Sequence, residues 1–133
     1  MKGNIYFHPA FQFHDFGSAP KLLILLNEPV LEEPYIIAKT TSNLRERMYS
    51  KGCNDKLGVF YIEANADGNF SKPTLITVND VYEISNNEFT KDIQLQLVAC
   101  LADLTMSQII NCIRKYRDDI SVKHFDLVTK KAG

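Results

Sequence analysis

The sequence predicts a mainly β (α+β) fold in which one amphipathic helix near the C-terminus plugs a small barrel or a strongly bent sheet. Gly, Pro, Asn and Asp residues interrupt the chain at short intervals, which is typical of short strands joined by turns. One late segment instead has the apolar period of a helix. Because a single helix can cover only one open face, this combination favours a small, strongly curved β structure.

The composition indicates one ordered domain. Hydrophobic residues make up 45% of the 133 residues and charged residues 23%, both near the average of globular proteins. A chain of this length can bury its own core. We therefore expect a single domain over residues 1–133, with strands over about 3–101, a helix over about 105–118 and a frayed tail over 129–133.

The strands are predicted from short apolar or alternating runs. They are Ile5–Phe7, Lys21–Asn27, Tyr35–Thr40, Val59–Glu63, Pro73–Val78, Val81–Ile84 and Ile93–Leu97. Lys21–Asn27 is continuously apolar, which indicates a buried central strand, and Ile93–Leu97 alternates, which indicates a half-buried one. Residues 9–20 are interpreted as a loop and residues 43–54 as a loop or a helical turn. Asp67-Gly68 and Asn86-Asn87 are predicted turns.

The helix is predicted from capping and periodicity. Thr105, with Gln108 three residues later, has the pattern of a capping box. One apolar face then follows at helical spacing, formed by Met106, Ile109, Ile110, Ile113 and Tyr116. Asp118-Asp119 would oppose the helix dipole, so the helix is expected to end there. The segment Ser121–Val128 is predicted to be extended, and residues 130–133 to be frayed.

Charge and cysteine usage restrict the function classes. The formal net charge of −1 argues against a strong general nucleic-acid binder, but it leaves room for a local basic groove. We expect no signal peptide, since the N-terminus lacks an apolar stretch, and no apolar run reaches the roughly 20 residues that cross a bilayer. The odd number of cysteines, Cys53, Cys100 and Cys112, favours free thiols in a cytoplasmic protein, with Cys100 and Cys112 in the core.

Common catalytic and cofactor motifs are missing, so we predict neither a metal nor a cofactor. His8, His14 and His124 have no cysteine partners at zinc spacing and are interpreted as polar loop residues. The glycine-rich phosphate loops of nucleotide-binding proteins do not occur. Cys53 lies near two lysines that would favour its thiolate, yet an inert loop thiol is the simpler interpretation.

Two polar segments are the candidates for chemistry. Residues 39–47, with the sequence KTTSNLRER, follow an apolar strand and offer hydroxyl and guanidinium groups, which suit contacts with phosphate or an RNA backbone. The alternative is a solvated turn. Residues 9–20 carry Phe11, Phe13 and Phe16, which either stack on bases or pack beneath the loop. A histidine titrates near neutral pH, so His14 is the candidate proton donor or acceptor there.

The order of segments resembles the MazF/PemK-like toxin family, also called the CcdB/PemK-like barrel. Gly3-Asn4-Ile5-Tyr6 corresponds to the family's opening strand, and Ala19-Pro20 precedes an apolar strand as the family's Arg-Pro does. Thr41-Ser42 matches the Thr-Ser that ends the second strand. Residues 72–84 and 97–116 resemble the later strands and the final helix, so the similarity covers about residues 3–117.

The resemblance implies an SH3-like β-barrel with a C-terminal helix, a homodimer, and an antitoxin partner. It also implies metal-independent cleavage of single-stranded RNA, in which a ribose 2′-hydroxyl attacks the adjacent phosphate. Thr41 carries over as a phosphate contact. The family arginine is replaced by Ala19, and Lys21, two residues later on the same strand face, is expected to supply the cation.

The remaining site residues complete this hypothesis. His14 would be the mobile acid or base, and Lys39, Ser42, Arg45 and Arg47 would bind the substrate. The alternative is a catalytically inactive barrel that binds a protein or a nucleic acid, which the replacement by Ala19 favours. A third hypothesis is a regulator that binds DNA or gyrase like the CcdB branch. Nothing favours it, because the sequence shows no helix-turn-helix signature.

Overall fold

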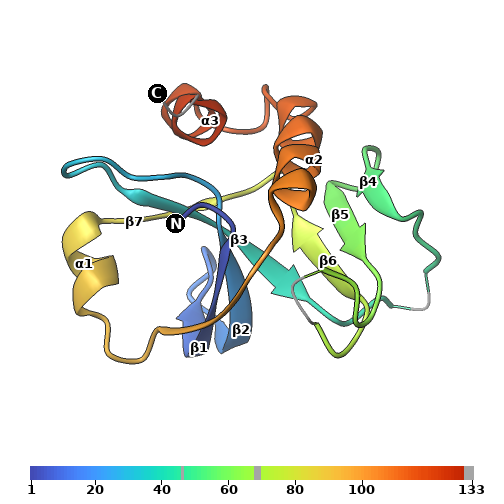
Figure 1. Cartoon of the computed structure of the whole chain (residues 1–133), viewed down its shortest axis with the longest axis horizontal. Helices are drawn as coiled ribbons and strands as arrows, with labels where there is room; N and C mark the ends of the chain where they lie inside the picture. Colours follow the sequence, from blue (N-terminus) through green and yellow to red (C-terminus); the bar gives the residue numbers. More distant parts are fainter. Residues whose placement is uncertain (46, 68–69, 131–133) are drawn as a thin grey trace.

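The computed structural model describes residues 1–45, 47–67 and 70–130, and over these residues the chain forms an open antiparallel sheet of eight strands with three helices (Figure 1). The mainly β prediction is therefore confirmed. The strands are β1 (Asn4–Gln12), β2 (Ser18–Leu25), β3 (Tyr35–Thr41), β4 (Gly52–Asn54), β5 (Val59–Ile62), β6 (Thr74–Thr77), β7 (Tyr82–Ile84) and β8 (Gln96–Cys100). The helices are α1 (Asn86–Lys91), α2 (Asp103–Arg114) and α3 (Val122–Thr129). None of the helices in the described part is long and apolar enough to cross a membrane.

The sheet divides at β3. Its order is β4-β5-β6-β3-β2-β1-β8, and β7 pairs separately with β3. One edge of β3 pairs with β2, and the other edge is shared: Thr40 and Thr41 pair with β6, whereas residues 35–37 pair with β7. Among the described residues no ladder joins β4 to β8, so the sheet stays open and bends instead of closing.

The β1–β2 hairpin replaces the loop predicted over residues 9–20. β1 continues to Gln12 and β2 begins at Ser18, so the turn spans only residues 13–17. Pro9 lies at a register shift between His8 and Phe11, where a bulge tolerates the missing N–H group. Pro20 lies in the part of β2 that precedes its pairing with β3. Prolines in these two positions do not interrupt the ladder.

Helix α2 was predicted correctly in type and face, but not in its bounds. It begins at Asp103 after an N-cap at Ala102, whose side chain offers no cap, and it ends at Arg114 instead of 118. The Ala102 N–H donates to the Asp67 carboxylate, 2.8 Å from Oδ2. An acidic side chain from a distant turn therefore assists the start of α2. The capping box predicted at Thr105 and Gln108 does not mark the start, because the helix has already begun at Asp103.

Two short helices and two strands differ from the prediction. Strand β4 lies at the end of residues 43–54, which were predicted to be a loop or a helical turn. The segment predicted to be extended is α3, where the Ser121 side chain accepts a hydrogen bond from the His124 N–H at 3.1 Å. The turn predicted at Asn86-Asn87 is the start of α1, which Ser85 and Glu88 cap. The last strand is β8, three residues later than predicted, and Ile93 is exposed. Gly68 of the predicted Asp67-Gly68 turn, and residues 131–133 of the predicted frayed tail, lie outside the described residues.

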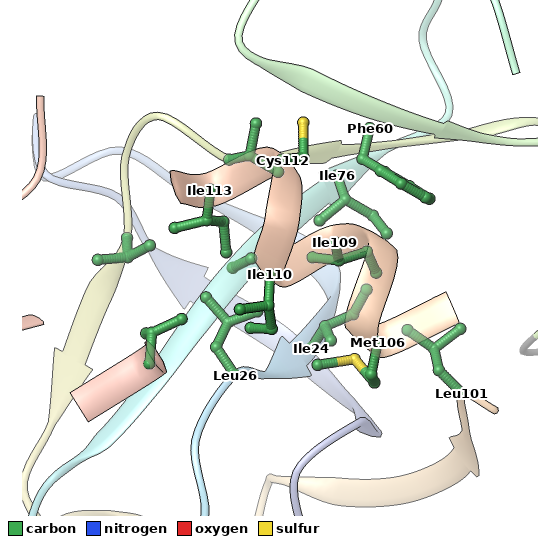
Figure 2. Packing of buried hydrophobic residues seen from close by; sticks show 14 of the residues in the cluster. Ile24, Leu26, Phe60, Ile76, Leu101, Met106, Ile109, Ile110, Cys112 and Ile113 are labelled. Carbon is green, nitrogen blue, oxygen red and sulfur yellow. The ribbon is translucent and has the colours of Figure 1, made fainter. Parts of the chain in front are cut away.

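Apolar clusters cover both faces of the central strands. In Figure 2 the side chains of α2 point onto the sheet, where Ile109 and Ile113 are fully buried near Ile24 and Ile76. The opposite face of the sheet carries a second cluster that includes Leu23, Leu25, Ile37 and Tyr82. Successive residues of β2 thus enter different clusters, which explains why its sequence is continuously apolar.

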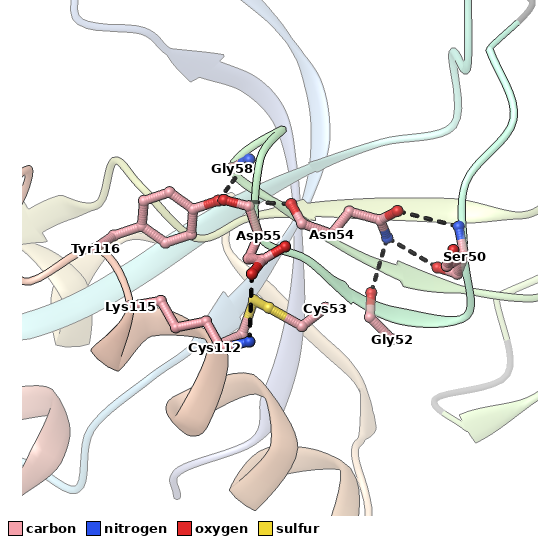
Figure 3. Close-up of a disulfide and its surroundings, with 9 residues drawn as sticks. All are labelled: Ser50, Gly52, Cys53, Asn54, Asp55, Gly58, Cys112, Lys115 and Tyr116. Atoms are coloured by element: carbon pink, nitrogen blue, oxygen red, sulfur yellow. Dashed lines mark hydrogen bonds and ion pairs between the residues drawn. A yellow bond between two sulfur atoms is a disulfide. The ribbon is translucent and has the colours of Figure 1, made fainter.

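Cys53 of β4 and Cys112 of α2 form a disulfide, so the prediction of free thiols is wrong for these two residues (Figure 3). Their Cα atoms are 5.6 Å apart although 59 residues separate them in sequence. Cys53 therefore cannot serve as a nucleophile in this state. Cys100 is a free thiol, but it is exposed on β8 and not part of the core.

A substitution at Gly3 tests how closely Met106 of α2 packs against β1 and its N-terminal turn. The φ of Gly3 is +95°, and a Cβ atom would lie 3.0 Å from Met106 Cγ. Gly52 has a similar φ of +90° with open space around it. We expect Gly3→Ala to lower the unfolding free energy by about 2–3 kcal/mol, because backbone strain and crowding add, and Gly52→Ala by about 1 kcal/mol. Urea denaturation measures the unfolding free energy of both variants. An equal decrease in the two would show that the Met106 side chain moves aside without an energetic penalty.

Candidate functional site

A polar pocket of about 410 Å³ lies where β3 divides between β6 and β7. It brings together five of the predicted site residues: His14, Lys21, Lys39, Thr41 and Arg45. The other lining residues are Phe13, Asp15, Thr40, Asn43, Thr77, Asp80 and Tyr82. The pocket therefore joins the β1–β2 turn, the end of β3 and the β6–β7 connection.

Strand geometry explains why the two lysines meet. Leu23 is the partner of Lys39 in the β2–β3 ladder, and cross-strand partners share a sheet face. Lys21 is two residues before Leu23, so it lies on that face too. Thr41, two residues after Lys39, also lies there. The spacing that suggested Lys21 from sequence thus places it with Lys39 and Thr41 at one end of two paired strands.

The two ammonium groups lie over an aromatic floor. Lys39 Nζ is 5.4 Å from the ring centroid of Phe13 and 5.9 Å from that of Tyr82, and Lys21 Nζ is 5.9 Å from the Phe13 centroid. Burial lowers the pKa of Lys21, and the positive charge of Lys39 lowers that pKa further. Without a bound anion, Lys21 therefore releases a proton more easily than an ordinary lysine. An anion placed near both ammonium groups would relieve their repulsion and offset part of this effect.

His14 contacts Asp80 and Tyr82, although 58% of its side chain is exposed. Its Nε2 is 3.3 Å from Asp80 Oδ1, and its ring stacks on Tyr82 with centroids 3.8 Å apart. The His14 backbone N–H also donates to the Tyr82 hydroxyl at 3.3 Å. With Nε2 directed to the carboxylate, Nδ1 is the nitrogen available for proton exchange with a substrate. Asp15, the sequence neighbour, instead accepts a hydrogen bond from the Gly17 N–H at 2.9 Å.

The chain after β3 is shaped by its own polar side chains. Thr41 Oγ1 accepts a hydrogen bond from the Asn43 N–H, and Asn43 Oδ1 accepts one from the Arg45 N–H, each at 3.1 Å. Arg45 has a φ of +51°, which turns the chain at the pocket rim. The Thr41 hydroxyl proton remains available for donation. The solvated-turn alternative is partly right, since these residues do cap local backbone groups.

Ser42 and Arg47 are not part of this lining. Ser42 lies in a neighbouring hollow that also includes Lys21 and Thr41, so it is one step removed from the pocket. Arg47 is exposed, and its backbone N–H donates to the Leu44 carbonyl at 3.1 Å. Its predicted role on a flanking phosphate concerns a surface outside this pocket and stays a prediction.

Sequence reasoning missed Asp80 and Tyr82. Both are far from His14 in sequence, and Asp80 falls between the predicted strands Pro73–Val78 and Val81–Ile84. Ala19 pairs with Phe11 and is not among the residues that line the pocket. The local sequence carries no signal for a carboxylate that arrives from the β6–β7 connection.

The other two histidines serve structural contacts and are not loop residues as predicted. His8 in β1 is 3.1 Å from Asp92 through Nε2. His124 in α3 is 2.9 Å from Glu83, and Lys123 is 3.0 Å from the same carboxylate. Hydrogen bonds from Lys123 and His124 lower the pKa of Glu83. These contacts attach α1 to β1 and α3 to β7.

The pocket combines cations, a hydroxyl group and an oriented imidazole. Such a set suits recognition of a phosphodiester and acid–base work on it. No family model matches the chain, and no curated protein matches it. The function must therefore be inferred from the residues of the pocket.

Proposed function

We propose that the protein is a PemK/MazF-like toxin, an endoribonuclease that cleaves single-stranded RNA without a metal by attack of a 2′-hydroxyl. The observation that carries the proposal is the meeting of the His14–Asp80 pair with Lys21 and Lys39 in one open pocket. A base, a proton donor and positive charge at one phosphate are what this reaction requires.

His14 Nδ1 accepts the proton of the ribose 2′-hydroxyl, and the resulting oxyanion attacks the adjacent phosphorus. The bond between phosphorus and the 2′-oxygen forms as the bond to the 5′-oxygen breaks, which leaves a 2′,3′-cyclic phosphate. The Lys21 ammonium protonates the departing 5′-oxygen, a role that its lowered pKa favours. Asp80 orients His14 and stabilises the imidazolium. The His14 imidazolium then releases its proton to solvent, and Lys21 takes up a proton from solvent, which restores the starting state.

Lys39, Thr41 and Arg45 bind the phosphate in this scheme. Lys39 stands beside Lys21 over the same rings, and both ammonium groups oppose the charge that develops on the phosphoryl oxygens. The Thr41 hydroxyl donates to one of those oxygens. Ser42 and Arg47 would contact the flanking backbone, where exposed groups add affinity but little to the chemical step.

The proposal extends to the wider properties of such toxins. It comprises an opened relative of the SH3-like barrel, a homodimer, an antitoxin protein that blocks the pocket, and a cytoplasmic location. The bent antiparallel sheet with a C-terminal helix supports the first of these. The disulfide weighs against the last, since disulfides are rare in the reducing cytosol.

The Lys21→Ala variant tests the assignment. We expect its cleavage rate on a mixed-sequence RNA, in excess chelator, to fall roughly 10- to 100-fold, since Lys39 retains part of the positive charge. Lys21→Arg keeps the charge and should recover binding more than rate, because an arginine does not release its proton. Lys72→Ala, an exposed lysine outside the pocket lining, is the matched control. Full activity of Lys21→Ala would contradict the proposed role.

The second candidate is a catalytically inactive module that binds RNA or a protein through the same pocket. The observation that favours it is Ala19, which leaves the family's arginine position with only a methyl group. A folded wild-type protein that binds RNA but leaves it intact, with enzyme in excess over RNA, would support this candidate. Product analysis for a cyclic phosphate end separates it from the endoribonuclease.

A further inference from the structure

The aromatic residues of the β1–β2 hairpin have three different environments. Phe11 is buried, with only 6% of its surface exposed, and its ring meets Phe13 edge-on at 5.9 Å between centroids. Phe13 packs against the second apolar cluster and lies under the two lysines. Phe16 is 83% exposed at the tip of the turn. Of the three rings, only Phe16 presents its faces to solvent.

Phe16 is held in place by the hairpin tip around it. Its φ is +69°, a conformation that a bulky residue rarely adopts. The Phe13 N–H donates to the Gly17 carbonyl at 2.7 Å, and the Phe16 N–H donates to the Phe13 carbonyl at 3.0 Å. The Asp15 carboxylate binds the Gly17 N–H. The tip therefore holds the Phe16 backbone in a conformation that costs free energy, while its side chain is left exposed to solvent.

Phe16 is next to the pocket in sequence. His14 and Asp15, the two residues before it, both line the pocket, and His14 contacts Asp80 and Tyr82. A nucleotide chain with a phosphate at Lys21 and Lys39 would therefore have the hairpin tip within reach of a neighbouring base. Every base has a π-face, and stacking on an exposed ring needs no hydrogen-bond readout.

We propose that Phe16 is a stacking platform for one unpaired base of the RNA, next to the linkage that is cleaved. This inference rests on the proposed function. It defines the substrate class further: the nucleotide at the tip must be unstacked from its neighbours, so a duplex is excluded and a flexible single strand is preferred. Phe16 is thus a specificity-determining residue outside the pocket lining.

The experiment measures binding separately from cleavage. The probe is a single-stranded 2′-O-methyl oligonucleotide, which cannot be cleaved by 2′-hydroxyl attack. We expect Phe16→Ala to weaken its binding roughly 5- to 150-fold, the range of base–aromatic stacking. Phe16→Trp should restore the affinity. Leu31→Ala is the matched control, since Leu31 is also an exposed apolar residue with a positive φ, at 94% exposure, but lies outside the pocket lining.

Salt and abasic sites identify the interaction as stacking. The loss caused by Phe16→Ala should be the same at low and high salt, whereas the loss caused by Lys39→Ala should shrink as salt rises. In a series of probes with one abasic nucleotide each, one position should weaken wild-type binding, and Phe16→Ala should add no further loss there. Additive losses at every position, or wild-type affinity in Phe16→Ala, would overturn the inference.

The outcomes distinguish this inference from the proposed function. Binding that depends on Phe16, without any cleavage of natural RNA by the wild type, would refute the endoribonuclease activity and support the stacking platform. Cleavage by Phe16→Ala with unchanged affinity would support the endoribonuclease activity and refute the stacking platform. A wild-type protein that does not bind the single-stranded probe at all would overturn both.

Discussion

The His14→Ala variant is expected to cleave RNA with a kcat roughly 100- to 10,000-fold lower than the wild type, the usual contribution of a positioned general base. His14 supplies the imidazole of the pocket lining, and its Nε2 lies 3.3 Å from Asp80 Oδ1, so it is the group proposed to accept the 2′-hydroxyl proton. Binding should change less than rate, because the phosphate contacts from Lys39 and Arg45 remain. Single-turnover cleavage of a defined oligonucleotide measures the chemical step directly.

Two further variants make this result specific. Asp80→Asn keeps the shape of the carboxylate but removes its charge, so the rate should fall while RNA affinity is retained. His124→Ala removes a histidine that also contacts a carboxylate but lies on α3, and its rate should equal that of the wild type. A His14→Ala protein that cleaves at the wild-type rate would refute the proposed mechanism, whatever its affinity.

Removing the disulfide is expected to lower the unfolding free energy by about 4 kcal/mol, because the bond closes a loop with a sequence separation of 59. The bond joins β4 to α2, and Tyr116 adds a second link there, since its hydroxyl accepts a hydrogen bond from the Gly58 N–H at 2.9 Å (Figure 3). The double variant Cys53→Ala, Cys112→Ala tests this in urea denaturation. The midpoint should move to lower urea than that of the wild type.

Reduction and Cys100 provide the controls. Wild-type protein with a reductant should approach the stability of the double variant, and Cys100→Ala should stay within about 0.5 kcal/mol of the wild type, since that thiol is exposed. Neither cysteine of the disulfide lines the pocket that contains His14 and Lys21, so the proposed cleavage should persist in reductant as long as the protein remains folded. Equal stability of the oxidised and reduced proteins would contradict the predicted contribution.

Periodicity predicted the parts of the fold that pack against large apolar surfaces. The continuous run of β2 and the apolar face of α2 are confirmed because burial alone dictates those patterns. The short helices were missed because their signals are local caps at Ser85 and Ser121 within polar sequence. The β1–β2 hairpin lies where residues 9–20 were predicted to be a loop, and a bulge accommodates Pro9 within β1.

The candidate site was predictable where its residues belong to neighbouring strands. Lys21, Lys39 and Thr41 converge because period-two geometry and one ladder place them together. Asp80 and Tyr82 were not predictable, because their approach to His14 depends on how β7 pairs with β3. The Cys53–Cys112 pairing likewise depends on where α2 crosses β4, which spacing along the sequence cannot reveal.

The pairing of β1 with β8 has a consequence for biosynthesis. The ladder joins Asn4 to Cys100, so the outer edge of β1 stays without its partner until residues 96–100 have emerged from the ribosome. During the same interval Ile24 is not yet packed against the apolar face of α2, because α2 is translated after β8. All the pocket residues have emerged by then. A nascent chain thus carries every residue of the site while an open strand edge and a bare apolar face remain accessible to chaperones or to other nascent chains.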